Sequence, residues 1–335
     1  MKNELISIVM PVKDAALFLQ ECVDSILSQS EENWELIAVN DHSSDSSFQL
    51  LNNYASIDSR VTAVNNKGDG IIDSLQTAYA LSKGAYIHRM DADDIMPVQK
   101  LTHLKSILQE KGKGWIATGK VNYFAEGGVS DGYQLYANWL NDLCERRTHW
   151  VEIYKECVIP SPCWLIHRED FENCGGFSPN RYPEDYDLVF RFYEQQLKVA
   201  SSNEVLHHWR DHSERTSRNH IHYQHNTFFE LKLDYFFKLE RDNKRPLVVW
   251  GAGSKGKLMA KLLNQRGLDY TWVSNNPKKH GKEIYEQIMQ SFEDILTTDN
   301  PQVIITVALK NAKNEIIEFL ELNGLMPYKD YWFFQ

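Results

Sequence analysis

Apolar runs of strand length alternate with segments of helical periodicity along the first hundred residues. Between the runs, apolar positions recur every three or four residues, first from Leu17 to Leu27 and again from Gly70 to Leu81. This alternation predicts an α/β fold in which helices cover both faces of a mostly parallel sheet. The predicted strands are Leu5 to Val12, Trp34 to Asn40, Arg60 to Asn66 and Ala85 to Met90.

Polar and charged residues follow three of the predicted strands. They are Pro11 to Asp14, Asp41 to Asp45 and Asp91 to Asp94. In open parallel α/β sheets the ligand binds outside the carboxyl ends of the strands. We therefore expect these three loops to converge on one site.

The pattern changes further along the chain. It is less regular from about Trp115 to Ala200, and Ser217 to Lys244 is typical of a helical connection. Pro246 marks a boundary, after which a strand, a Gly-rich turn and a helix follow one another. We predict a first domain at residues 1–216, a helical linker at 217–245 and a small Rossmann-like α/β domain at 246–335.

Composition narrows the class of protein. The net charge of −10 argues against nucleic-acid binding, which favours a basic surface, and against broad adhesion to anionic membranes. No apolar run reaches about 18 residues, and the N-terminus carries charges where a signal peptide is apolar. Five scattered cysteines without a C-x-x-C pair indicate neither a disulfide framework nor a zinc knuckle. We expect a cytoplasmic protein without a transmembrane segment; peripheral contact with the inner face of the membrane and homo-oligomerisation stay open.

Asp91 and Asp93 form the most conspicuous acidic motif. In an extended segment, residues two apart point to the same side, so the two carboxylates would converge, while Asp94 would point away and brace the following turn. Two such carboxylates suit Mg²⁺ or Mn²⁺ bound together with substrate phosphates. A solvated acidic turn explains an isolated D-x-D equally well, so the motif depends on its surroundings.

Four blocks in order supply those surroundings. Together they resemble the family 2 glycosyltransferases, nucleotide-sugar-dependent enzymes of the GT-A fold, across roughly residues 4–220. The blocks are Ser7 to Ser47, Gly84 to Leu101 with the D-x-D, Ser161 to Arg191 with a Glu-Asp pair, and His207 to Ser217.

The resemblance implies a GT-A α/β/α nucleotide-sugar-binding domain and a role for each matching residue. On the donor side, Asp41 would receive the uracil or equivalent base, and Pro11 and Lys13 would line the nucleotide pocket. Asp91 would face the ribose and the metal shell, and Asp93 would bind the metal that bridges the diphosphate.

On the acceptor side the resemblance makes Asp185 the general base and Glu184 a residue that orients donor or acceptor. A helix N-terminus is the alternative interpretation of this acidic pair, because Pro183 and acids precede an apolar helical pattern. His212 lies where some members supply another metal ligand.

The His- and Arg-rich segment from His207 to His225 is open to other interpretations. A zinc peptidase motif fails because Trp209 follows His208 where H-E-x-x-H requires Glu. Arg210, Arg215 and Arg218 are candidates for diphosphate contact. Solvated charges are the alternative for Arg215 and Arg218.

Several positions depart from the family pattern. Gln76 and Ala78 stand where many members carry Asn and Gly, Asp73 replaces a small residue, and His42 stands where Gly is common. We expect these departures to alter the fine positioning of the donor relative to the family. The chain also has no Q-x-x-R-W block, which disfavours a processive polysaccharide synthase.

The glycines Gly251, Gly253 and Gly256 form a candidate ligand loop in the C-terminal domain. They fit G-x-G-x-x-G, but Ser274 to Pro277 replaces the acid that would bind a ribose, and Leu258 replaces the hydroxyl of a phosphate loop. The segment resembles the small Rossmann-like domain appended to certain sugar C-methyltransferases. A bound nucleotide or phosphate and a role in packing or oligomerisation are both open.

These observations predict a metal-dependent inverting glycosyltransferase. It would use Mn²⁺ or Mg²⁺ to move a sugar from a nucleotide sugar, most simply a UDP-sugar, to a glycan or lipid-linked hydroxyl acceptor in surface polysaccharide or glycan synthesis. The alternatives are a GT-A-like sugar nucleotidyltransferase, for which the segment after Val9 lacks a Gly-rich triphosphate loop, and a noncatalytic nucleotide-binding module.

Overall fold

The computed structural model describes residues 4–213, 215 and 227–334. Its contacts divide the chain into one unit of Met1–Trp150 with Cys157–His222, and a second of Val151–Glu156 with Tyr223–Gln335. The six residues from Val151 to Glu156 therefore belong to the second unit, although the sequence analysis placed them in the first domain. Part of the predicted linker lies outside the described residues.

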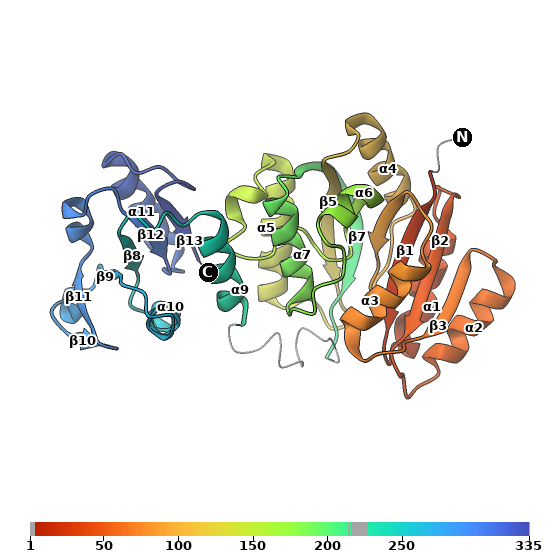
Figure 1. Cartoon of the computed structure of the whole chain (residues 1–335). Helices are drawn as coiled ribbons and strands as arrows, with labels where there is room; N and C mark the ends of the chain where they lie inside the picture. The colour runs from red at the N-terminus through yellow and green to blue at the C-terminus, as the bar shows by residue number, and fades with distance from the viewer. Residues whose placement is uncertain (1–3, 214, 216–226, 335) are drawn as a thin grey trace. The chain divides into compact units, whose positions relative to one another are not determined.

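A seven-stranded sheet forms the centre of the first unit, in the order β3-β2-β1-β4-β6-β5-β7 (Figure 1). Its strands are β1 (Ile6–Val12), β2 (Trp34–Asn40), β3 (Val61–Asn65), β4 (Tyr86–Arg89), β5 (Trp115–Phe124), β6 (Trp164–His167) and β7 (Lys198–Arg210). Its helices are α1 (Ala16–Leu27), α2 (Ser47–Ile57), α3 (Gly70–Leu81), α4 (Lys100–Lys111), α5 (Asp131–Arg146), α6 (Arg168–Asn173) and α7 (Glu184–Glu194); the short 3₁₀ helix η1 (Trp150–Glu152) follows α5.

The direction of the strands brings most of their carboxyl ends to one edge of the sheet. β1 is parallel to β2 and β4, and β2 is parallel to β3. β6 runs antiparallel to both β4 and β5, so β5 runs in the direction of β4, and β7 is parallel to β5. The predicted α/β class with a mostly parallel sheet is confirmed. We call the shared edge the carboxyl edge.

The less regular region after residue 115 contains three strands that periodicity did not reveal. β6 is only four residues long and is buried, so it shows no alternation. β7 lies at the outer side of the sheet, where its residues Lys198 to Glu204 are partly or fully exposed and all but Val199 and Ala200 are polar. Strands of both kinds escape a search for alternating apolar positions.

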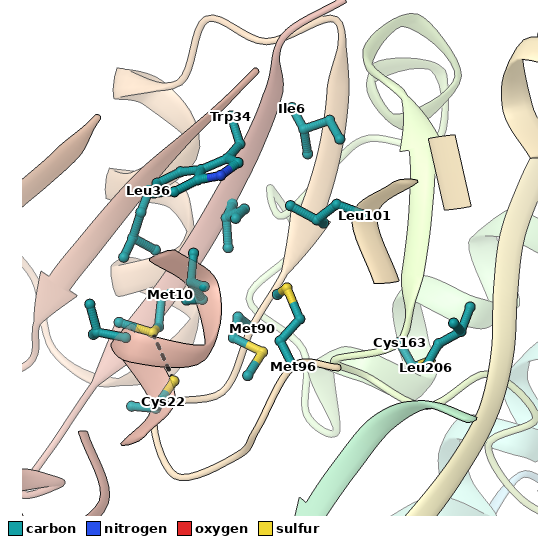
Figure 2. Close-up of a cluster of buried hydrophobic side chains, with 14 of the residues drawn as sticks. Ile6, Met10, Cys22, Trp34, Leu36, Met90, Met96, Leu101, Cys163 and Leu206 are labelled. Carbon is teal, nitrogen blue, oxygen red and sulfur yellow. Dashed lines mark hydrogen bonds between the residues drawn. The ribbon is translucent and has the colours of Figure 1, made fainter. Parts of the chain in front are cut away.

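The main core lies under one face of this sheet. Ile6, Ile8, Met10 and Val12 alternate along β1 into a cluster to which α1, α2, α4 and α5 contribute apolar side chains. Figure 2 shows part of it, including the contact between Met10 and the thiol of Cys22.

Two methionines of this core fix the segment that carries the D-x-D. Met90 and Met96 precede and follow the acidic residues, and they are 0% and 1% exposed (Figure 2). Burial of a methionine side chain stabilises by about 1.5–3 kcal/mol. The short acidic segment is therefore anchored at both ends.

The second unit contains a six-stranded sheet in the order β10-β11-β9-β8-β12-β13. All neighbouring strands are parallel except β10 and β11. Its strands are β8 (Leu247–Trp250), β9 (Thr271–Ser274), β10 (Glu283–Ile284), β11 (Gln287–Ser291), β12 (Gln302–Ile305) and β13 (Tyr331–Phe333). Its helices are α9 (Thr227–Leu239), α10 (Ser254–Gln265), α11 (Lys310–Leu322) and the 3₁₀ helices η3 (Pro277–Lys279) and η4 (Phe292–Thr297).

The segment from Val151 to Glu156 packs into this second unit. The ring of Tyr154 stacks on Phe334 at 5.1 Å, and Lys232 donates a hydrogen bond to the carbonyl of Lys155 at 2.7 Å. Throughout the described ranges, none of the helices has the length and apolar character needed to span a bilayer.

Candidate active site

The D-x-D segment is a turn rather than a continuation of its strand. β4 ends at Arg89, and the amide of Asp94 donates to the carbonyl of Asp91 at 3.4 Å. The expected extended geometry is wrong, so spacing alone does not place these carboxylates. Asp91, Asp93 and Asp94 instead each face a different basic partner.

Asp91 is bound by Arg89, two residues before it. Arg89 Nε donates to Asp91 Oδ1 at 3.1 Å, and its Nη1 donates to Glu184 Oε1 at 3.1 Å. Burial raises the pKa of Asp91, against the lowering effect of Arg89. Sequence reasoning looked for the positive charge outside the chain and missed Arg89. Its signal was a guanidinium at the last position of a short buried strand.

Asp94 is fully buried and accepts two hydrogen bonds from β7. They come from His207 Nε2 at 2.9 Å and the backbone amide of Arg210 at 2.8 Å. Lys100 donates to His207 Nδ1 at 3.1 Å, which leaves the proton of the imidazole on Nε2, facing Asp94. Burial lowers the pKa of Lys100 to about 8. Asp94 braces the turn, as expected, but through a buried chain of three side chains.

Asp93 lies against His212. His212 Nε2 is 2.8 Å from Asp93 Oδ2, and the ring of Phe18 packs on the imidazole with centroids 4.6 Å apart. The other ring nitrogen, Nδ1, is buried and has no hydrogen-bond partner among the residues described. Two of the three predicted metal ligands are thus adjacent, and Asp91 is directed to Arg89.

Within the part of the chain that the structure describes, a second group of possible metal ligands lies away from the D-x-D turn. It consists of Asp41, His42 and Asp69, whose ligand atoms lie within 4.8 Å of one another. Asp41 is already engaged there by Asn66 Nδ2 at 2.8 Å and by the backbone amide of Gly70 at 3.0 Å. These bonds hold the end of β2 to the start of α3.

Pro11, Lys13 and Asp41, the residues predicted to contact the nucleotide, lie at the carboxyl edge as expected from the strand ends; their nucleotide contact stays a prediction. Lys13 Nζ is 3.5 Å from Asp41 Oδ2, and Pro11 lies beside Val39 near the end of β1. Asn66 was not considered from the sequence, which made it the last residue of a predicted strand; in the structure β3 ends at Asn65, so Asn66 follows its strand as Asp41 follows β2.

Arg210 has several partners close to the acidic turn. Its Nε donates to the carbonyl of Asp93 at 2.8 Å, it pairs with Glu21, and its guanidinium lies over Phe18 at 4.8 Å. Its predicted diphosphate contact stays a prediction.

Arg215 is not a solvated charge, so that alternative is wrong. Its guanidinium lies 4.8 Å from the ring centroid of Trp209 and 5.3 Å from those of Tyr123 and Tyr133. Arg218 lies outside the described residues.

Glu184 and Asp185 occupy the first turn of α7, which Pro183 precedes. Asp185 Oδ1 accepts a hydrogen bond from the amide of Tyr186 at 2.8 Å. Burial, together with the neighbouring Glu184, raises the pKa of Asp185 to about 7. The helix-start interpretation of the pair is therefore confirmed. The role of Asp185 as general base stays a prediction, with which a pKa of about 7 is compatible.

Gln76, one of the departures from the family pattern, supports this helix. Its Nε2 donates to the carbonyls of Phe177 at 2.8 Å and Ser178 at 3.2 Å, in the loop that leads to α7. Gln76 therefore ties α3 to the loop that precedes α7.

The glycine loop of the second unit is closely packed. A Cβ atom at Gly256 would lie 1.9 Å from the carbonyl oxygen of Gly251, whose φ of +135° is accessible mainly to glycine. Lys279 donates to the carbonyl of Ala252 at 2.6 Å. Close packing accounts for Gly251 and Gly256, and ligand binding by this loop with Gly253 stays a prediction.

The profile of the family described as Glycosyl transferase family 2 matches residues 7–175, about half of the chain. This chain belongs to glycosyltransferase family 2. The match contains the D-x-D turn and ends before α7 and before the six-stranded sheet of the second unit.

Relatives and solved structures agree with this assignment. The glycosyltransferase GlyG of Streptococcus pneumoniae is 28% identical over 219 residues, which cover 62% of this chain and 71% of GlyG. Chondroitin synthase of Pasteurella multocida is 27% identical over 212 residues, 61% of this chain but 21% of the synthase. The structure of S. aureus TarS 1-349 in complex with UDP-GlcNAc has a TM-score of 0.53 at 13% identity, covering 78% of this chain and 72% of TarS 1-349. At that identity the likeness shows the fold, and the GT-A-like class is confirmed.

We predict that Asp94 is essential for the stability of this glycosyltransferase. Asp94→Ala should lower the free energy of unfolding by about 3–5 kcal/mol, because it leaves His207 and Lys100 buried without their carboxylate. Asp58→Ala, which breaks a partly exposed pair with Arg60, should cost about 0–1 kcal/mol. Urea unfolding followed by tryptophan fluorescence measures both. Equal losses would show that the buried chain is not a major source of stability.

Proposed function

We propose that this glycosyltransferase moves a sugar from a UDP-sugar to a hydroxyl acceptor, with a divalent cation and with inversion at the sugar carbon. The observation that carries the proposal is that the Asp93–His212 pair and the helix bearing Asp185 are joined through the same acidic turn, by Arg89. TarS in its complexes with UDP and UDP-GlcNAc supports the donor class, and the chondroitin and hyaluronan synthases among the relatives support a role in polysaccharide or glycan synthesis.

We assign the nucleoside to the end of the sheet where β1 and β2 finish. The Asp41 carboxylate, fixed by Asn66 and Gly70, offers an acceptor for a base N–H, and Lys13 and Pro11 lie beside it. Asp91, fixed by Arg89, is assigned to the ribose and the metal shell. In this arrangement the diphosphate would extend toward Asp93.

Asp93 and His212 fit a divalent metal. Their facing atoms are 2.8 Å apart, and the pair combines a carboxylate with an imidazole, a donor set better suited to Mn²⁺ than to Mg²⁺. A bound metal would act as a Lewis acid that stabilises negative charge on the departing nucleoside diphosphate. Arg210, whose backbone and side chain both bind the acidic turn, keeps the segment before His212 in place.

We assign proton removal from the acceptor hydroxyl to Asp185. Tyr186 donates to one of its oxygens, which orients the carboxylate, and a base with a pKa near 7 is matched to neutral conditions. With a single base that activates the acceptor hydroxyl and no enzyme nucleophile, the hydroxyl displaces the nucleoside diphosphate directly. The configuration at the sugar carbon is then inverted. Glu184, bound to Arg89, orients the groups around the reacting carbon.

We assign the second unit a packing or oligomerisation role. The crowding around Gly251 and Gly256 supports this choice over nucleotide binding. We also propose that this unit is related to the small Rossmann-like domains appended to certain sugar C-methyltransferases.

Asp185→Asn should abolish most transfer while leaving donor binding intact. Loss of the base lowers kcat by roughly 10²- to 10⁴-fold, because the hydroxyl then has no proton acceptor. Sugar transfer and calorimetric binding of the donor measure the two effects. The control is Glu169→Gln, which removes an exposed carboxylate paired with Lys113. A kcat close to that of the unsubstituted enzyme would exclude Asp185 as the base.

The pH dependence of kcat/KM should contain an acidic limb near pH 7. Asp185 must be a carboxylate to accept a proton, and its pKa is raised to about 7, so kcat/KM should fall as pH decreases through that value. We expect close to a tenfold loss per pH unit well below the limb. A flat profile from about pH 5.5 to 8.5 would contradict the assignment.

UDP with Mn²⁺ should raise the melting temperature more than either alone. A ligand at 100 times its Kd stabilises the native state by about 2.7 kcal/mol, or roughly 5–10 °C for a domain of this size. Asp93→Asn and His212→Ala should each reduce the contribution of Mn²⁺, whereas Glu169→Gln should not. If no nucleotide and metal combination shifts the melt, the donor assignment fails.

A further inference from the structure

Arg89 joins two parts of the site that are far apart in the sequence. Its Nε binds Asp91 in the D-x-D turn, and its Nη1 binds Glu184, 95 residues further along the chain, at the start of α7. Arg89 is 5% exposed and Glu184 is 7% exposed. One buried guanidinium therefore links the proposed donor side to the proposed acceptor side.

The shape of the side chain makes this link directional. A guanidinium is planar and presents its N–H groups in a rigid fork, so two carboxylates bound to different nitrogens are fixed relative to each other. A lysine ammonium, a point charge on a flexible stem, would not impose that geometry. The carboxylates are also alike in charge, so without a cation between them they would repel where little water screens them.

Two other contacts near α7 join groups outside the D-x-D. Gln76 holds the loop before the helix, and Arg191 pairs with Asp187 at 2.8 Å within it. The Arg89 bridge is a different kind of contact, because it ends on the strand that leads into the acidic turn.

We propose that Arg89 is a positioning residue that couples Asp91 to Glu184, so that the donor and the acceptor base are aligned together. This inference rests on the proposed function. In this proposal Arg89 acts through Asp91 and Glu184, because its two hydrogen bonds set the relative placement of the segments that carry these carboxylates.

A double-mutant cycle tests this coupling. Arg89→Met and Glu184→Gln should each lower kcat/KM about 100-fold, with Arg89→Met also raising the donor KM because Asp91 loses its partner. The double variant removes the buried pair as a unit. Its kcat/KM should be about 10-fold higher than the value obtained by multiplying the two single-variant losses. Losses that simply multiply would overturn the proposal.

A matched cycle supplies the control. Arg60 pairs with Asp58 at 2.8 Å just before β3, at the opposite edge of the sheet. Arg60→Met, Asp58→Asn and their combination should change kcat/KM by no more than about twofold, even where they lower the melting temperature. A drop like that of Arg89→Met would mean that loss of any such pair impairs the enzyme through stability alone.

Arg89→Lys keeps the test decisive if Arg89→Met folds poorly. With a positive charge retained it should fold and bind UDP with Mn²⁺, yet kcat should stay at least 10-fold low because the fork is lost. Full activity in Arg89→Lys would overturn the positioning role. Absence of transfer and nucleotide binding in the unsubstituted enzyme would instead refute the proposed function, so the two failures are distinguishable.

Discussion

Arg89 is the buried cation that lets carboxylates gather at the carboxyl edge of the large sheet. Asp91 and Glu184 share it, and neither is exposed enough for water to screen their mutual repulsion fully. Asp94 has a separate arrangement, with His207 and Lys100 buried behind it. The acidic site thus depends on positive charges that the chain itself supplies. These already neutralise part of the carboxylate charge, and a metal would neutralise more of it.

The fold determines which residues can take part in that balance. Because β6 is inserted antiparallel between β4 and β5, the ends of β5 and β7 come to the same edge as the D-x-D. Ile95 and His208 then exchange two backbone hydrogen bonds of 3.0 Å, which fix the acidic turn to β7. The strand that ends at Arg210 therefore carries His212 to Asp93.

Sequence reasoning found the parts of this arrangement that are local in the chain. Periodicity predicted the helix from Gly70 to Leu81 with the bounds that the structure shows, and the strand ends located Asp41 and the D-x-D. It erred where tertiary contacts decide the outcome. The D-x-D turns because Asp94 is drawn into the core by His207, and Arg215 is desolvated because rings from β5, α5 and β7 surround it. The contact between Arg89 and Glu184 could not be inferred from the sequence, because it forms only when α7 packs on the sheet.

The central claim is that the D-x-D turn with His212, and not the cluster of Asp41, His42 and Asp69, receives the metal and diphosphate. Crystals grown with UDP and Mn²⁺, measured at the manganese absorption edge, test it most directly. We expect an anomalous peak in contact with Asp93 and His212 and with the diphosphate of UDP. A peak at Asp41, His42 and Asp69, or UDP bound away from the carboxyl edge, would contradict it.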